Sequence, residues 1–208
     1  MKSLNESLPR TGANSGQGIV IDIGTGDGRF VSAMAKASPN KFFIGIDANV
    51  KPLEKPSMKA TRKLNKGGLP NVMFVQAAVE VLPEEFTGVA DEIHIHFQWG
   101  SLLRAVVLGE RKILGSLRRI AAQSCLLEII IGIDPERDES EYARLELPVL
   151  NLEHFRKIAD SRYDTVGFRT VEIRELSFKE WRKIETTWAR KLSSSSNRSV
   201  IQLVFQAK

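Results

Sequence analysis

Glycines cluster directly after the first strongly apolar run of the sequence, in the order D-I-G-T-G-D-G-R. Gly24, Gly26 and Gly28 stand where a backbone can approach a bound ligand closely. A dinucleotide-binding loop has the spacing G-x-G-x-x-G, whereas here the third glycine comes one residue early and Arg29 takes its place. Asp22, just before the glycines, favours a cationic or zwitterionic ligand and repels a diphosphate. The segment therefore predicts a nucleotide-type loop that suits S-adenosylmethionine and not NAD.

A second acidic residue, Asp47, ends the next apolar run, I-G-I-D, about 20 residues after the glycines. A carboxylate at this place can accept hydrogen bonds from both hydroxyls of a ribose. After the third apolar run, Val79 and Glu80 could reach an adenine edge through backbone amides or the Glu80 side chain. A glycine-rich turn can be only a tight turn, and Asp47 could be a helix cap. The two features together, in a strand-helix-strand frame, favour a cofactor site.

Trp99 follows the fourth apolar run, in H-F-Q-W-G-S-L-L, at the place where a methyl acceptor would meet the cofactor. Enzymes that methylate exocyclic amines commonly carry a [DNS]-P-P-[YFW] turn here, whose carbonyl takes the amine proton, and that turn is missing. A ring nitrogen such as adenine N1 has an in-plane lone pair and needs no base. Catalysis then reduces to alignment in a desolvated pocket. The missing turn therefore favours methylation of a ring nitrogen.

A second tryptophan, Trp188, is a further candidate for contact with the methyl acceptor. Trp188 lies in a basic stretch, and a base flipped from its stack regains about 1–3 kcal/mol from each aromatic face on which it stacks. Trp99 and Trp188 could therefore hold a flipped base, although both could be ordinary core tryptophans, as we expect for Trp181.

His94 and His96 alternate with isoleucines and share one face of a strand. We expect packing or hydrogen bonding from them, and no metal site.

The elements that must position these residues follow from the hydrophobic pattern. Short β-branched runs alternate with longer helical patterns, the first of which spans about 29–37. Strands are predicted at 19–23, 42–46, 72–76, 92–97, 126–133, 168–173 and 200–205. This alternation predicts an α/β fold with a seven-stranded, mostly parallel, doubly wound sheet. Ligands of such sheets bind at the carboxyl ends of the strands.

The rest of the chain is predicted to form segments around this core. Residues 1–17 are polar and are expected to form a flexible arm before one domain at 18–208. Insertions are expected at about 134–150, before a helix near 151–162, and at about 175–198. The second insertion is predicted to be a basic helix, containing a tryptophan, that ends in a serine-rich loop.

Composition limits the class of protein. The chain has 208 residues, 42% hydrophobic and 26% charged, which is typical of one folded soluble domain and excludes a disordered or coiled-coil protein. Cys125 is the single cysteine, so an intramolecular disulfide and a cysteine-cluster metal site are excluded. The first residues lack an apolar leader, and no run approaches the roughly 18 apolar residues of a membrane span. We expect a cytoplasmic monomer with no membrane partner.

The net charge of +5 is distributed unevenly. The summed charge of segments 51–66 and 179–198 exceeds the net charge of the whole chain, so the remaining residues are net negative. The first contains cations at helical spacing, namely Lys55, Lys59, Arg62 and Lys66, with Lys63 beside them. A run of charge is usually a solvated helix face. Because acidic partners are not interleaved with these cations, we favour one basic ridge that binds RNA phosphates.

Five segments together resemble the aminoglycoside-resistance 16S ribosomal RNA methyltransferases that modify N1 of a decoding-centre adenine. They are D-I-G-T-G-D-G at 22–28, I-G-I-D at 44–47, K-G-G-L-P-N at 66–71, F-Q-W-G-S-L-L at 97–103 and W-A-R-K-L at 188–192. The resemblance extends from about residue 18 to the end. It implies a Rossmann-like class I S-adenosylmethionine-dependent methyltransferase fold with inserted recognition segments. The implied substrate is 16S rRNA within the 30S subunit, and the implied outcome is aminoglycoside resistance.

The resemblance also implies roles for individual residues. The cofactor would be surrounded by Asp22, Gly24, Gly26, Phe30, Asp47, Val79, Glu80, His96, Phe97, Gln98, Gly100 and Ser101. Trp99 and Trp188 would sandwich the flipped adenine, with Thr186 near the base and the methionine portion. RNA would be contacted by the ridge at 55–66 and by Arg190, Lys191 and Arg198. One departure is Gln98, where the family carries proline.

Two other functions remain open at this stage. A tRNA guanine-N7 methyltransferase has a similar glycine loop and second strand, and its ring-nitrogen target also needs no base. A cofactor-binding RNA-binding protein without catalysis is the non-enzyme alternative, for which Gln98 is the only hint. A small-molecule methyltransferase fits less well because two basic segments are present.

Overall fold

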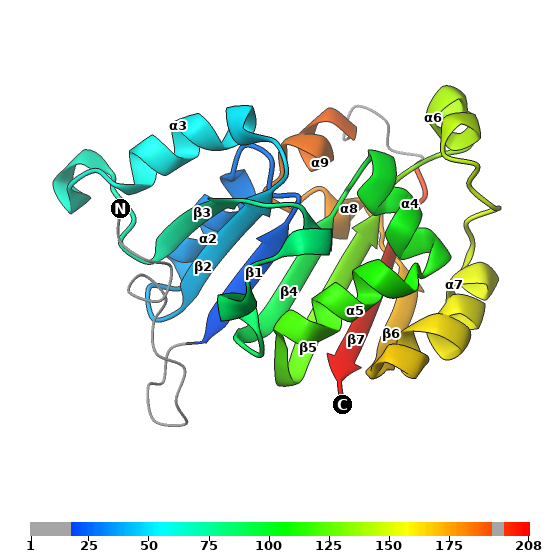
Figure 1. Ribbon diagram of the computed structural model, residues 1–208. Coiled ribbons are helices and arrows are strands. Elements are labelled where there is room, and N and C mark those ends of the chain that lie inside the picture. Colours follow the sequence, from blue (N-terminus) through cyan, green and yellow to red (C-terminus); the bar gives the residue numbers. More distant parts are fainter. Residues whose placement is uncertain (1–17, 193–197) are drawn as a thin grey trace.

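The computed structural model describes residues 18–192 and 198–208, so the predicted arm at 1–17 and the serine-rich loop lie outside the described residues. Seven strands form one sheet in the order β3-β2-β1-β4-β5-β7-β6 (Figure 1). Their bounds are β1 Ile19–Ile23, β2 Phe42–Asp47, β3 Val72–Gln76, β4 Ala90–His96, β5 Ala121–Ile131, β6 Phe168–Glu175 and β7 Ile201–Ala207. Only β7 runs antiparallel to its neighbours β5 and β6. The predicted mostly parallel α/β sheet is confirmed.

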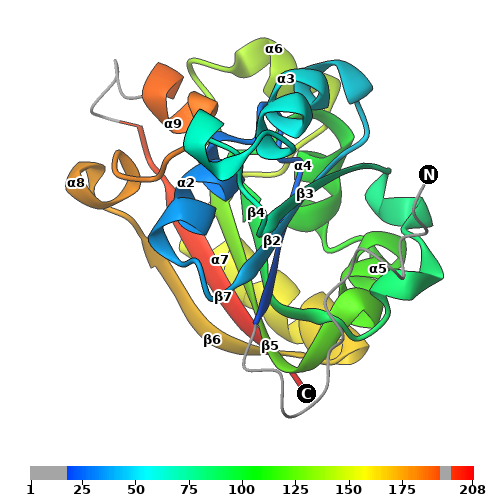
Figure 2. The same cartoon turned by 90° about the vertical axis from the view of Figure 1, so that its left-hand side faces the viewer.

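Helices cover both faces of the sheet, which explains why β1 is apolar at every position except Asp22. Ile19 and Ile21 belong to the large core beneath α4 (Gly100–Leu108), α5 (Arg111–Ile120) and α7 (Leu152–Ile158). Val20, on the opposite face, packs with Phe43 and with α2 (Arg29–Ala37). The two views show α4 and α5 on one side of the sheet and α2 on the other (Figures 1 and 2). Burial on both faces accounts for the lack of polar alternation in this strand.

The shorter elements gather at the ends of the sheet. α3 (Val50–Ala60), α6 (Glu139–Arg144) and α9 (Thr187–Leu192) lie at the top in Figure 1, beyond the carboxyl ends of the parallel strands. α8 (Phe178–Trp181) lies on the α2 side. Single turns of 3₁₀ or π helix occupy Leu64–Lys66, Val79–Val81, Glu84–Phe86, Ala159–Tyr163 and Asp164–Val166. None of the helices in 18–192 and 198–208 is long and apolar enough to cross a membrane.

The predicted helical ridge over 51–66 is wrong in one respect, because α3 ends at Ala60. The Leu69 amide donates to the Ala60 carbonyl, which turns the chain back onto the helix end. Gly68 makes this approach possible, since a Cβ there would lie 1.7 Å from the Arg62 carbonyl oxygen. Arg62 and the lysines after it therefore lie on a turn beyond the helix.

The predicted single helix over 175–198 is also wrong. β6 extends to Glu175, and two short helices, α8 and α9, follow it. Ser177 and Glu180 form a capping box that begins α8. The Thr186 hydroxyl accepts a hydrogen bond from the Ala189 amide and begins α9, so the threonines interrupt the helical pattern. The described part of the insertion thus places Trp188 near the start of a separate helix.

Candidate functional site

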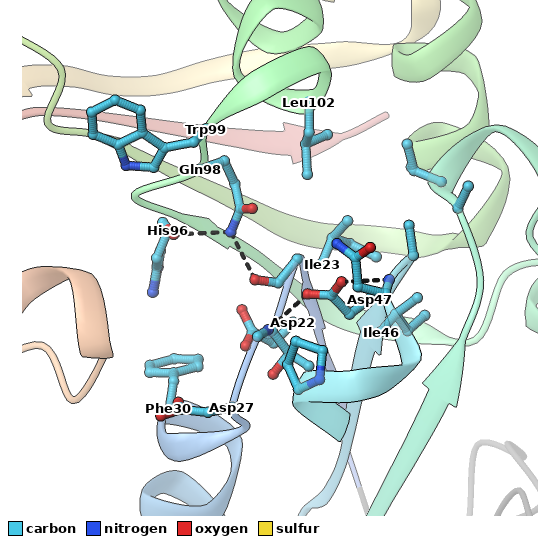
Figure 3. Close-up of a pocket in the computed structure, with 18 of the residues that line it drawn as sticks. Asp22, Ile23, Asp27, Phe30, Ile46, Asp47, His96, Gln98, Trp99 and Leu102 are labelled. Atoms are coloured by element: carbon cyan, nitrogen blue, oxygen red, sulfur yellow. Dashed lines mark hydrogen bonds between the residues drawn. The ribbon is translucent and has the colours of Figure 1, made fainter. Parts of the chain in front are cut away.

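A cavity of about 510 Å³ opens at the carboxyl ends of β1, β2 and β4 (Figure 3). It is lined by the predicted cofactor residues Asp22, Gly24, Gly26, Phe30, Asp47, Val79, Glu80, His96, Gln98 and Ser101. The predicted acceptor residues Trp99, Thr186 and Trp188 line it too. Segments that are far apart in the sequence therefore meet in one cavity. Its position agrees with the ligand site expected for an open parallel sheet.

The glycine-rich loop forms one wall of this cavity and is held by the second strand. Gly24 and Gly26 have φ angles of +73° and +55°, a left-handed conformation that favours glycine. The Gly24 amide donates to the Ile46 carbonyl at 2.7 Å, and the Gly26 amide donates to the Asp47 carboxylate at 2.9 Å. Asp47 also accepts from the Asn49 amide at 2.8 Å (Figure 3). One carboxylate thus fixes the loop and faces the cavity.

Asp22 supplies negative charge at the cavity wall. Its side chain is buried, and burial raises the pKa of the carboxyl above its ordinary value, although the nearby His96 opposes this shift. A buried carboxylate is costly to keep ionised without a positive partner. A ligand that brings an ammonium group would supply that partner. The ammonium and sulfonium of S-adenosylmethionine therefore fit this wall, and a diphosphate does not.

Gln98 links the acceptor turn to the glycine loop. Its side-chain amide donates to the carbonyls of Gly24 at 2.9 Å and His96 at 3.0 Å (Figure 3). A Cβ on Gly24 would lie 2.1 Å from the Gln98 amide oxygen, so glycine is required for this contact. Phe97, just before it, has a φ of +50°, an uncommon conformation for a residue with a side chain. The turn is thus fixed by hydrogen bonds that the Gln98 side chain donates.

Two predicted cofactor residues do not line the cavity. The Phe97 ring is 1% exposed and packs against Trp181, with ring centroids 6.2 Å apart. Its positive φ directs the side chain into a separate apolar cluster. Gly100 begins α4, and its amide donates to the Glu141 carboxylate at 3.0 Å. These two residues shape the turn from behind the cavity.

The two candidate tryptophans contact each other. Their ring centroids are 4.9 Å apart with 27° between the planes, and Lys191 Nζ lies 4.8 Å from the Trp188 centroid. Trp188 is 38% exposed, so it is not a core tryptophan, whereas Trp181 is fully buried as expected. A base stacked between the rings would lie about 3.5 Å from each of them, so the two rings would have to be about 7 Å apart. The pair must therefore separate by roughly 2 Å to accept a base.

A hydrogen bond that the sequence does not reveal ties α9 to the glycine loop. The Thr187 hydroxyl donates to the Asp27 carboxylate at 2.7 Å, and Arg29 Nε donates to the same oxygen at 2.8 Å. These two segments are 160 positions apart, so no local pattern connects them. The contact fixes the start of α9, which carries Trp188, relative to the glycine-rich loop that lines the cavity.

We expect Thr187→Val to lower methyl transfer by about two- to tenfold, because one hydrogen bond contributes roughly 0.5–1.5 kcal/mol. Affinity for S-adenosylmethionine should stay within about twofold, since Thr187 supports the tryptophan side of the cavity. Initial rates and calorimetric binding of the cofactor would measure both. Thr165→Val removes a comparable surface hydroxyl bond remote from the cavity and serves as the control. Strict additivity of Thr187→Val with Asp27→Asn would contradict a direct coupling.

The predicted RNA-binding cations differ in their surroundings. Lys55 and Lys59 on α3 are exposed, as are Arg62, Lys63 and Lys66 on the following turn. Arg190 and Lys191 are exposed on α9. Arg198, in contrast, is 9% exposed, forms an ion pair with Asp138 and donates to the Gly132 carbonyl at 2.7 Å. This environment disfavours the predicted RNA contact by Arg198, because its guanidinium is used inside the protein.

Comparisons with known proteins agree with this geometry. The model of the NpmA family, described as 16S rRNA (adenine(1408)-N(1))-methyltransferase, matches residues 4–207. An Escherichia coli protein of the same description is 35% identical over 88% of this chain and 84% of its own length. The crystal structure of the aminoglycoside resistance methyltransferase NpmB1 is 49% identical, with a TM-score of 0.81 over 92% of this chain and 87% of that one.

A relative from Catenulisporales acidiphilia bears on the cofactor. The crystal structure of its 16S rRNA (adenine(1408)-N(1))-methyltransferase, a tryptophan-to-alanine mutant with cosubstrate SAM, is 34% identical. It has a TM-score of 0.83 and covers 91% of this chain and 85% of that one. A tRNA (guanine-N(7)-)-methyltransferase from Thermotoga maritima is more distant, at 23% identity over 91% of this chain and 54% of its own length.

Proposed function

The chain belongs to the 16S rRNA (adenine(1408)-N(1))-methyltransferase family, and from this premise we propose that it methylates N1 of that adenine. Its fold is that of the Rossmann-like class I methyltransferases, and S-adenosylmethionine is the cofactor. The observation that carries the proposal is one cavity in which the two strand-end aspartates face the acceptor tryptophans. Because N1-methylation adds a methyl group and positive charge in the decoding centre, the expected outcome is aminoglycoside resistance.

The cofactor has a proposed place for each of its parts. Asp22 binds the ammonium of the methionine portion, and Asp47 accepts the ribose hydroxyls. Val79 and Glu80 meet the adenine edge, and the glycine loop lets the backbone approach the cofactor closely. S-adenosylmethionine supplies an activated methyl group on a sulfonium. Gln98 holds the acceptor turn against the glycine loop, which fixes the distance between the cofactor and the base.

The acceptor needs positioning and no proton acceptor. Adenine N1 carries its own lone pair, so no side chain has to remove a proton before attack. We propose that Trp99 and Trp188 separate and stack on the two faces of the flipped adenine. Thr186 lines the cavity between the cofactor loop and α9. The chain thus contributes alignment and exclusion of water, which together account for large rate effects.

The substrate is proposed to be 16S rRNA in the assembled 30S subunit, bound by a monomer in the cytoplasm. Exposed cations on α3, on the turn after it and on α9 lie at the carboxyl end of the sheet, where the cavity opens (Figure 1). Phosphates of a structured RNA would contact these cations while a base enters the cavity. This arrangement supports the basic segments as docking surfaces although they do not form one helical ridge.

Transfer of labelled methyl groups tests the proposal. The purified protein is incubated with labelled S-adenosylmethionine and, in parallel, 30S subunits, free 16S rRNA or bulk tRNA. Label is expected in 16S rRNA from 30S subunits, and expression in a susceptible host should reduce killing by aminoglycosides. Label in tRNA alone would favour the guanine-N7 alternative. Tight 30S binding without transfer would favour a protein that has lost catalysis.

We expect the double variant Lys55→Glu/Lys59→Glu to weaken 30S binding roughly tenfold at physiological salt. The slope of log binding constant against log salt concentration should become shallower by about 2. The reason is that both lysines are exposed on one side of α3, four residues apart. Filter binding over a salt series measures both quantities. The control is Lys36→Glu/Lys112→Glu, which reverses the same charge on α2 and α5. Equal losses in both variants would indicate a non-specific effect of net charge.

A further inference from the structure

Three side chains with metal-binding atoms meet on the sheet face that α2 covers, beside the cofactor cavity. His94 Nδ1 lies 3.0 Å and His96 Nε2 lies 2.7 Å from the same oxygen, Oε2, of Glu128. One donor atom from each side chain lies within 4.8 Å of the other two. The hydrogen bonding expected for the two histidines is confirmed. Glu128, which no sequence pattern singled out, completes a set of two imidazoles and one carboxylate.

The sheet itself builds this cluster. Alternation along β4 puts His94 and His96 on one face, and the parallel register pairs His94 with Glu128 on β5. The Phe30 ring of α2 covers both imidazoles, at centroid distances of 5.1 Å and 4.7 Å. Donor atoms held on adjacent strands of a central sheet are fixed more precisely than donors on loops.

Outer contacts of the cluster resemble those around protein metal sites. His94 Nε2, on the side away from Glu128, lies 3.4 Å from a Glu92 oxygen, and Glu92 is itself held by Lys41. The second oxygen of Glu128 accepts from the Gln202 amide at 2.5 Å. A metal-bound imidazole usually directs its other nitrogen to a carboxylate, and a metal-bound carboxylate is usually hydrogen-bonded in turn. The second condition holds for Glu128, and the first is approached by His94 alone, because His96 Nδ1 has no hydrogen-bond partner among the described residues.

A second cavity, of about 500 Å³, gives access to the cluster. It is lined by the three side chains and by residues of α2, β6, β7 and the α8 segment. Side-chain exposures are 14% for His94, 3% for His96 and 24% for Glu128. An ion could therefore enter from solvent and keep one coordination position for water. This is the pattern of three protein ligands and one open position.

We propose that His94, His96 and Glu128 bind one divalent transition-metal ion, with water as the fourth ligand. The donor set suits Zn²⁺, Ni²⁺ or Cu²⁺ and is poor for Mg²⁺ and Ca²⁺, which prefer oxygen. With bonds of about 2.1 Å, tetrahedral donors lie about 3.4 Å apart, so the side chains must spread by a few tenths of an ångström. The open cavity beside them allows this movement.

The metal site would affect cofactor binding. His96 lines both cavities and interacts electrostatically with Asp22, the proposed partner of the cofactor ammonium. An ion of charge +2 beside His96 would itself stabilise the ionised carboxylate of Asp22. The cofactor ammonium would then gain less binding free energy from its contact with Asp22. Zn²⁺ should therefore weaken S-adenosylmethionine binding, and by linkage the cofactor should weaken Zn²⁺ binding by the same factor.

Several charged groups surround the cluster. Burial lowers the pKa of His94, but hydrogen bonds from the imidazole to Glu128 and Glu92 outweigh burial and raise the pKa to about 9. The charged groups that face the cluster are Asp22 and Glu92 on the sheet, Lys41 before β2, and Arg174, Glu180, Lys183 and Glu185 around the second cavity.

Titration calorimetry of tag-free, chelator-treated protein tests the proposal. Zn²⁺ is titrated at pH 7.5, with Mg²⁺ as the comparison ion, and Co²⁺ is used to detect tetrahedral absorption bands. We expect one Zn²⁺ per chain and no Mg²⁺ binding. Saturating Zn²⁺ should weaken cofactor affinity at least about fivefold. No Zn²⁺ binding by the wild-type protein would overturn the site, and an unchanged cofactor affinity would overturn the linkage.

Matched variants distinguish this site from adventitious binding. His94→Gln and Glu128→Gln should each weaken Zn²⁺ binding at least about tenfold. The third histidine of the chain, His154, donates from Nε2 to the Val107 carbonyl, away from the cluster, so His154→Gln should leave binding unchanged. Circular dichroism verifies that each variant is folded. Equal binding by wild-type and both cluster variants, or its loss in His154→Gln alone, would contradict the assignment.

Discussion

Trp188→Ala is expected to lower methyl transfer to 30S subunits by about 5- to 150-fold, because stacking on one aromatic face contributes about 1–3 kcal/mol per base. Cofactor affinity should remain within about twofold. Trp188 is 38% exposed and stacks on Trp99, so its removal takes little from the core. Single-turnover rates with saturating cofactor would measure the loss in the transfer step, and calorimetry would measure cofactor binding.

Two variants sharpen this prediction. Trp188→Phe keeps an aromatic face and should retain most of the transfer rate. Trp99→Ala should show a similar loss of transfer, together with a lower melting temperature, because Trp99 packs against the large core. If Trp188→Ala lowered cofactor affinity and transfer equally, the tryptophan would have a structural role and not a base-stacking role.

Asp22→Asn should reduce affinity for S-adenosylmethionine by at least about 30-fold, since loss of one partner of a buried charge pair costs roughly 2–5 kcal/mol. The substitution keeps the size of the side chain. The free energy of unfolding of the cofactor-free protein, in contrast, should stay the same or rise. The folded-state pKa of Asp22 is raised by burial, so ionisation of this carboxyl costs stability above its ordinary pKa, and this cost disappears in the amide.

The opposite signs make the test of Asp22 decisive. Calorimetry gives the affinity, and thermal melting of the cofactor-free protein at pH 7 should show an unchanged or higher melting temperature. Asp164→Asn changes an exposed carboxylate that pairs with Lys208, remote from the cavity, and should leave affinity unchanged. Normal cofactor binding by Asp22→Asn would contradict the proposed ammonium contact. A large fall in melting temperature would mean that Asp22 supports the fold.

The sequence predicts the sheet and the cofactor wall well because both depend on local signals. Continuous apolar runs identify strands that are covered on both faces, and the glycines and Asp47 mark strand ends that meet at one edge. The end of α3 was not predictable in this way. A tertiary contact decides it, since Gly68 packs against the Arg62 backbone and the chain turns back.

The contacts that hold the acceptor side together could not be read from spacing. Thr187 meets Asp27 across 160 positions, and Glu128 meets His94 only because of the register between β4 and β5. Arg198 has the residue type of an RNA contact, yet Asp138 draws its guanidinium into the protein. In each case, side-chain type suggested a chemistry and tertiary structure selected the partner.

Primer extension along 16S rRNA is the most direct test of the central claim, that this protein methylates adenine N1 in the decoding centre. Methylation of N1 blocks the base-pairing edge, so reverse transcriptase should stop next to the adenine at position 1408 only when protein, 30S subunits and S-adenosylmethionine are all present. Asp22→Asn and Trp188→Ala should weaken that stop. The absence of a stop at this adenine, or a stop at another nucleotide, would contradict the account.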